Sequence, residues 1–157
     1  MTETTQAARP VIVVGVDGSE ASKDALRWAV VQAGLTNADV HAQMAWQVPG
    51  TYALVPPYPY DFDIEGATAK ALEEVVDGIF GADRPFGLST QVVEGHPVTT
   101  LVEAARDAVL LVVGSRGHGA FAGMMLGSVS EHCVAHATCP VVVVRHPAAS
   151  VSAPVGR

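Results

Sequence analysis

The sequence predicts an α/β fold: a single doubly wound five-stranded parallel sheet with helices on both faces. Short runs of β-branched and other apolar residues alternate along the chain with segments of helical periodicity. The apolar runs are uninterrupted, which is typical of strands buried on both faces. The length of 157 residues is that of one domain, and 49% hydrophobic with 16% charged residues is a globular composition.

The first half of the chain begins this alternation. The run VIVVGV predicts a strand over Val11–Val16, which the turn-forming Asp17-Gly18-Ser19 ends. Ser19 is suited to cap a helix from Glu20 to about Gly34, and the next strand is expected over 40–48. Residues 49–65 carry four prolines, which excludes a helix there and is typical of a long loop or lid.

The second half continues the pattern. Pro97 favours a helix start, because its missing N–H is not needed in the first turn. The chain outside 10–147 is expected to form a disordered tail over 1–9 and a flexible tail over 148–157. The elements expected in order are a helix over 66–80, a strand over 88–94, a helix over 97–107, a strand over 108–113, a helix over 128–137 and a strand over 141–144.

Composition and charge exclude several classes of function. A formal net charge of −7 disfavours non-specific binding to nucleic acid and to anionic membranes. The N-terminal residues do not resemble a signal peptide, and no apolar run approaches the roughly 20 residues that span a bilayer. We therefore expect a cytoplasmic protein, whose Cys133 and Cys139 serve as small apolar side chains.

The chemistry of a doubly wound sheet lies beyond the carboxyl ends of its strands, where the strand order reverses. The glycine-rich loop after the fourth strand is the strongest candidate, because glycine lets the backbone approach a ligand closely. It leads into a helix whose free N–H groups suit an anion, and Ser128 and Ser130 add hydroxyls there. Arg116 adds a cation. These features predict anion binding.

This loop is neither a P-loop nor a dinucleotide-binding fingerprint. The pattern G-x-x-x-x-G-K-[ST] is absent, and the only lysines, Lys23 and Lys70, lie elsewhere. The pattern G-x-G-x-x-G does not follow the first strand.

The spacing instead resembles the G-2x-G-9x-G-[ST] signature of ATP-binding universal stress proteins. Gly114 and Gly117 are followed, after nine residues, by Gly127-Ser128. The segments VGVDGS, at the end of the first strand, and CPVVVV, from Cys139, are also similar to that family. The resemblance extends from about Pro10 to His146.

The resemblance implies strand order 3-2-1-4-5, with its reversal between the first and fourth strands. It also implies ATP as ligand and a homodimer formed through Val141–Val144. A Mg²⁺ ion that accompanies ATP would be held through the phosphates and not in a protein cage. Asp17 would accept from the ribose hydroxyls, and Ala45 would offer its backbone to adenine. The nucleotide-binding residues that it implies are Gly15, Val16, Asp17, Ala45, Gly114, Arg116, Gly117, His118, Gly127, Ser128, Val129 and Ser130.

Structural roles compete with these assignments. Asp17 can end a strand as an Asx turn, Arg116 can be a surface arginine, and the glycines can serve tight turns only. His132 and His136 share one helix face, but no third ligand is evident, so no metal site is expected. The tryptophans Trp28 and Trp46 are expected in the core.

The resulting expectation is an ATP-binding regulator of the stress response that hydrolyses ATP slowly or not at all. No lysine, glutamine or carboxylate can be placed beside an attacking water, so no catalytic residue is assigned. The alternatives are a module for AMP or a cyclic adenine nucleotide, and a structural stress protein without a nucleotide. An adenylating enzyme is disfavoured, because one small domain leaves little room for a second substrate.

Overall fold

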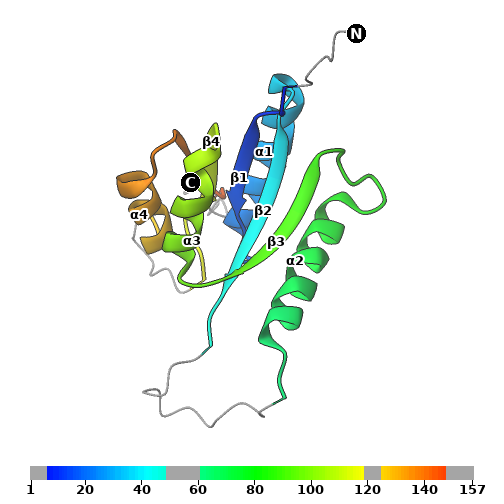
Figure 1. Ribbon diagram of the computed structural model, residues 1–157, viewed down its shortest axis with the longest axis vertical. Helices are drawn as coiled ribbons and strands as arrows, with labels where there is room; N and C mark the ends of the chain where they lie inside the picture. The colour runs from blue at the N-terminus through cyan, green and yellow to red at the C-terminus, as the bar shows by residue number, and fades with distance from the viewer. Residues whose placement is uncertain (1–6, 49–60, 119–124, 148–157) are drawn as a thin grey trace, which may run out of the picture.

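The computed structural model describes residues 7–48, 61–118 and 125–147. Its centre is one sheet of five parallel strands in the order β3-β2-β1-β4-β5, as expected (Figure 1). The order reverses between β1 and β4. The strands are β1 (Val11–Gly15), β2 (Asp39–Trp46), β3 (Leu88–Glu94), β4 (Leu110–Gly114) and β5 (Val141–Val144).

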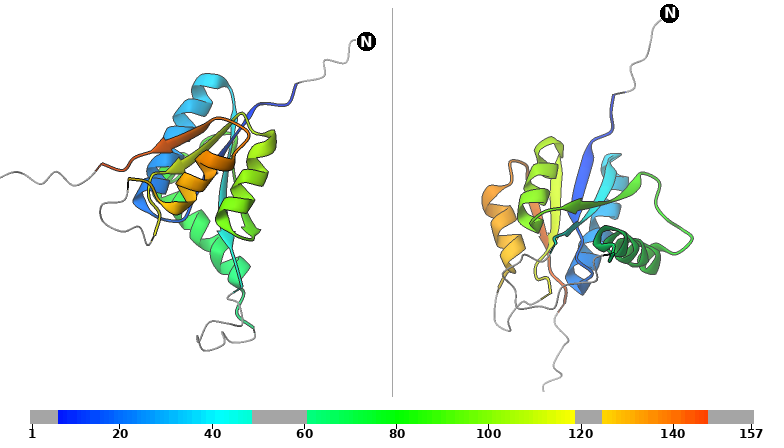
Figure 2. Two further views of the ribbon diagram at one scale, coloured as in Figure 1. Left: turned by 90° about the vertical axis from the view of Figure 1, so that its left-hand side faces the viewer. Right: turned by 60° about the horizontal axis from the view of Figure 1, so that its bottom comes forward.

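Helices cover both faces of the sheet (Figures 1 and 2). One apolar cluster joins α1 and α2 to one face, and a second joins α3 and α4 to the other. Strand β1 supplies apolar side chains to both clusters, because successive residues of a strand point to opposite faces. Ile12 and Val14 pack in the first cluster, and Val13 packs in the second. The helices are α1 (Glu20–Thr36), α2 (Ile64–Phe80), α3 (Pro97–Ala104) with a 3₁₀ turn over Ala105–Asp107, and α4 (Ser128–His136).

Capping residues explain where the helices begin. Ser19 caps α1 as predicted, its hydroxyl accepting from Ser22 N at 3.3 Å. Asp63 caps α2 through a bond from Gly66 N at 2.8 Å, so this helix begins two residues before the expected start. Helix α3 begins at Pro97, as expected, and His96 is the residue before it.

Two sequence-based expectations are wrong in this part of the fold. Helix α1 does not stop at Gly34 but continues to Thr36, because Asn37 adopts the left-handed conformation that closes it, at φ 53°. Trp28 is not a core residue, since 37% of it is exposed.

Other expectations fall on residues that are not described. The proposed lid lies mostly in 49–60, and the flexible tails lie mostly in 1–6 and 148–157. None of the described helices is long and apolar enough to cross a membrane.

Candidate functional site

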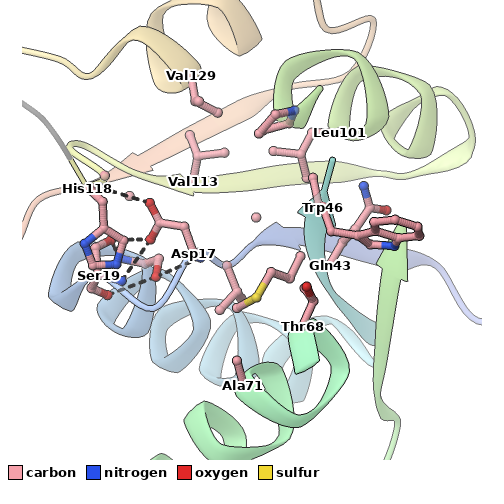
Figure 3. A pocket seen from close by; sticks show the side chains of 18 of the residues that line it. Asp17, Ser19, Gln43, Trp46, Thr68, Ala71, Leu101, Val113, His118 and Val129 are labelled. Carbon is pink, nitrogen blue, oxygen red and sulfur yellow. Dashed lines mark hydrogen bonds between the residues drawn. The ribbon is translucent and has the colours of Figure 1, made fainter. Parts of the chain in front are cut away.

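A cavity of about 780 Å³ opens at the carboxyl ends of β1, β2 and β4 (Figure 3). This is the edge where a doubly wound sheet places its ligands. All twelve residues assigned above line it: Gly15, Val16, Asp17, Ala45, Gly114, Arg116, Gly117, His118, Gly127, Ser128, Val129 and Ser130. The structure thus brings together three segments that lie far apart in the sequence.

Asp17 reaches from the end of β1 across to the loop after β4. Its Oδ1 accepts hydrogen bonds from Ser19 N at 2.9 Å and Ser19 Oγ at 2.5 Å. Its Oδ2 accepts from His118 N at 3.4 Å, a contact drawn in Figure 3. Asp17 therefore forms the Asx turn and also faces the glycine-rich loop.

The surroundings of Asp17 favour its charged form. Partial burial raises the pKa of this carboxyl, but the hydrogen bonds from Ser19, the contact with Ser22 and the charge of His118 outweigh burial. The net pKa of Asp17 is below its ordinary value, so the pocket holds a carboxylate at neutral pH.

Close approaches explain two glycines of the signature. A Cβ on Gly117 would collide with Asp17 Oδ2, so the absence of a side chain lets the loop face the carboxylate. A Cβ on Gly114 would lie 2.6 Å from the backbone carbon of Ala21, so Gly114 also admits the start of α1. The turn-forming and site-forming roles of these glycines coexist.

The N-terminus of α4 faces the same cavity. Gly127 precedes the helix and has no side chain that could cap its first N–H groups. Gly127 N donates to Ser115 O at 2.6 Å, which anchors the turn. This end of α4 presents donors and partial positive charge to the cavity, a setting suited to an anion.

The polar side chains of the loop differ in their availability. Arg116, His118 and Ser128 are exposed, whereas Ser130 is buried and its hydroxyl donates to Gly114 O. The hydroxyl of Ser130 thus holds the loop to α4, and Ser128 is the freer hydroxyl at the cavity.

Comparison with known proteins identifies the family. A profile of the universal stress protein family matches residues 9–145. The chain belongs to the universal stress protein family. A universal stress protein of Mycobacterium tuberculosis is 36% identical over 141 residues, covering 85% of this chain and 47% of the relative. The chain spans about half the length of the curated relatives it matches.

Solved universal stress proteins share the fold. One, in complex with cAMP, has a TM-score of 0.64 at 30% identity and covers 88% of this chain and 98% of its own. Another, from Lactobacillus plantarum, has a TM-score of 0.65 at 22% identity and covers 88% of this chain and 99% of its own.

Apart from Ala45, the wall that β2 and α2 form was not predicted from the sequence of this stress protein. From β2, Gln43, Met44 and Trp46 line the cavity. Trp46 is half-buried at this wall, so placing it in the core was wrong. Helix α2 contributes a largely apolar side of the cavity. Over the whole cavity, the lining residues that were not predicted from the sequence are Ser19, Ser22, Gln43, Met44, Trp46, Gln47, Phe62, Ile64, Ala67, Thr68, Ala71, Pro97, Leu101 and Val113.

The histidine pair and the cysteines lie outside this wall. The rings of His132 and His136 stack with centroids 6.2 Å apart on α4, and His132 Nδ1 lies 2.7 Å from Ser128 O. Among the described residues no group of three His, Cys, Asp or Glu is placed to hold a metal ion. Burial raises the pKa of Cys133 to about 11, so its thiol stays protonated, while Cys139 is only half-buried.

Proposed function

We propose that this protein binds ATP in the cavity and acts as a nucleotide-dependent regulator of the stress response. The observation that carries the proposal is the meeting of an anion-suited helix end, a charged Asp17 and a glycine-rich loop around one cavity. A nucleotide needs these features together, because it joins a polyanion to a sugar and a planar base.

Each part of the nucleotide has a matching group. The N–H groups at the start of α4, the hydroxyl of Ser128 and the guanidinium of Arg116 would hold the phosphates. Asp17 accepts from hydroxyl donors, so its carboxylate suits the ribose. The backbone of Ala45 would meet the adenine from the β2 side.

The residues at the cavity favour binding over rapid turnover. Lysine is absent from the described residues that line the cavity, and the carboxylate there, Asp17, is engaged by Ser19 and His118. Mg²⁺ would therefore be held mainly through the phosphates. We infer that hydrolysis is slow, because the described lining offers no lysine to the phosphates and its carboxylate, Asp17, already accepts hydrogen bonds within the protein.

A cyclic adenine nucleotide is the second candidate, and one observation favours it. The solved universal stress protein at 30% identity is in complex with cAMP. A cyclic nucleotide needs the same base and ribose contacts but fewer phosphate donors, so it uses less of the α4 end.

Calorimetric titration of the purified protein with ATP and with cAMP separates the two. We expect ATP to bind more tightly, because the α4 end and Arg116 reach a longer phosphate chain. Tighter binding of cAMP would support the second candidate, and no binding of either would leave only a structural role.

We also propose that the protein forms a homodimer through β5. This strand lies at the edge of the sheet and consists of four half-buried valines, without the charges or prolines that protect free edges. The exposed side chains of Val31 and Leu35 add apolar surface on α1, which packs beside β5.

A further inference from the structure

Among the described residues that line the cavity, Gln43 is a polar side chain whose burial has no structural explanation. It is 5% exposed, and its amide nitrogen Nε2 is fully buried without a hydrogen-bond partner in the described part of the chain. Native proteins rarely bury an amide unpaired, because the lost hydration is not replaced. Such a donor is expected where a bound molecule supplies the missing acceptor.

The position of Gln43 is fixed by the sheet. Gln43 O accepts from Val16 N at 2.9 Å, and in the register Gln43 lies between Gly15 of β1 and Gln91 of β3. Its neighbours in sequence, Ala42 and Met44, pack in the cluster under α1 and α2, so Gln43 lies on the opposite face, toward α3.

Apolar residues line the cavity together with Gln43 on this side of the sheet. Gly15 has no side chain, and Leu101 of α3 fills the space above it, since a Cβ on Gly15 would lie 2.8 Å from Leu101 Cδ1. Gln43 lines the cavity together with these two residues and is labelled with Leu101 in Figure 3. The unpaired amide thus belongs to a residue that borders the cavity beside apolar neighbours in the lining.

The two ends of the cavity differ in chemistry. The groups that suit phosphate and ribose come from the loops after β1 and β4, whereas Gln43 comes from β2, the strand that also carries Ala45. A buried neutral donor in an apolar wall suits a flat heterocycle with ring acceptors. Adenine offers N1, N3 and N7 as acceptors, and glutamine amides pair with adenine in nucleic-acid recognition.

We propose that Gln43 Nε2 donates a hydrogen bond to a ring nitrogen of the bound adenine, which makes Gln43 a specificity-determining residue. This inference rests on the proposed function, because it requires an adenine nucleotide in the cavity. The contact confers specificity, since a site built to pair with a polar group rejects analogues that lack it.

The test compares Gln43→Met with Gln91→Met. Both substitutions remove a side-chain amide, and the two positions are paired in the neighbouring strands β2 and β3. Gln91, however, is exposed and does not line the cavity. Titrations use ATP and its 1-deaza, 3-deaza and 7-deaza analogues. We expect Gln43→Met to bind ATP about tenfold more weakly, or about 1.4 kcal/mol, while Gln91→Met binds as the wild type does.

The analogues identify the contact. One of the deaza analogues should bind the wild type about tenfold more weakly than ATP does. The affinity for this analogue should be the same in Gln43→Met as in the wild type, because the analogue already lacks the hydrogen bond that the substitution removes. An equal loss for all three analogues in Gln43→Met, or an unchanged affinity for ATP, would overturn the inference while leaving nucleotide binding intact. A wild type that binds no nucleotide would instead overturn both proposals.

Thermal unfolding without nucleotide gives an independent readout. Gln43→Met should raise the melting temperature of the free protein, because an unpaired buried amide is replaced by an apolar side chain of similar length. A lower melting temperature, or failure to fold in both Gln43→Met and Gln43→Leu, would mean that the amide has a partner within the protein and would overturn the inference.

Discussion

Asp17 shows how one residue serves both the fold and the site. Its Oδ1 closes the turn before α1 through Ser19, while Oδ2 faces Gly117 and the backbone N–H of His118. The turn therefore orients the carboxylate that the proposed ribose contact requires. A purely local role would not need the approach of the second loop, 101 residues later in the chain.

The lowered pKa of Asp17 predicts a specific loss of stability in acid. Because its folded pKa lies below the unfolded value, its stabilising effect is present above about pH 4 and is lost as pH falls through the folded pKa. Wild type should be more stable than Asp17→Asn at pH 7, and this difference should shrink below about pH 4. Urea unfolding at both pH values measures it, and a difference that does not change with pH would contradict the prediction.

Where spacing carries information, the sequence identifies residues that the structure places at the cavity, although their role in binding stays a prediction. Gly114, Gly117 and Gly127 are set by a pattern that can be read directly from the sequence, and all three line the cavity. Gln43 was missed because nothing in the run around it distinguishes a buried amide from an exposed one. Only its register with Gly15, and the packing of α3, show that it is buried.

At the scale of elements, the strands were predicted closely because fully buried parallel strands have a strong sequence pattern. Helix ends were predicted less accurately, since Gly34 and Asn37 both suit a helix stop and only tertiary structure selects Asn37. The contribution of α2 to the cavity could not be predicted. It depends on how this helix packs along β2, which neither helical periodicity nor a motif encodes.

The continuation of α1 through Gly34 predicts a stabilising substitution. Gly34 lies within the helix with open space where a Cβ would stand, and glycine there costs about 0.5–1 kcal/mol relative to alanine. Gly34→Ala should raise the free energy of unfolding by roughly that amount. The control is Gly81→Ala, which has equally open space but sits at φ 55° and should destabilise the protein. Chemical denaturation that shows no gain for Gly34→Ala would contradict this account of the helix end.

At the scale of the whole molecule, the sheet has two edges of different character. The edge strand β3 carries alternating exposed residues, whereas β5 consists only of valines. The carbonyl oxygens of Pro140 and Val144 accept hydrogen bonds from the β4 side of the sheet. Because successive residues of a strand direct their N–H and C=O groups to opposite sides, those of Val143 point away from β4. This apolar edge, which no other described strand covers, is the surface proposed for the dimer.

The dimer proposal is tested by mass in solution. Light scattering should give twice the 16.3 kDa of the chain. Val143→Pro should give a monomer that keeps its helical circular dichroism, because proline removes the outward N–H that a partner strand would use. A wild-type protein that is monomeric at all concentrations would rule out the dimer. A Val143→Pro variant that remains dimeric would place the interface elsewhere.

Calorimetric titration of ATP into the wild type and into Gly117→Val tests whether the cavity binds the nucleotide. A valine at this position would collide with Asp17 Oδ2 and force the carboxylate away from the loop, while the sheet and its two apolar clusters stay intact. We expect saturable, one-to-one binding of ATP to the wild type and its loss in a Gly117→Val protein that still unfolds cooperatively. Unchanged ATP binding by Gly117→Val, or no binding by the wild type, would contradict this expectation.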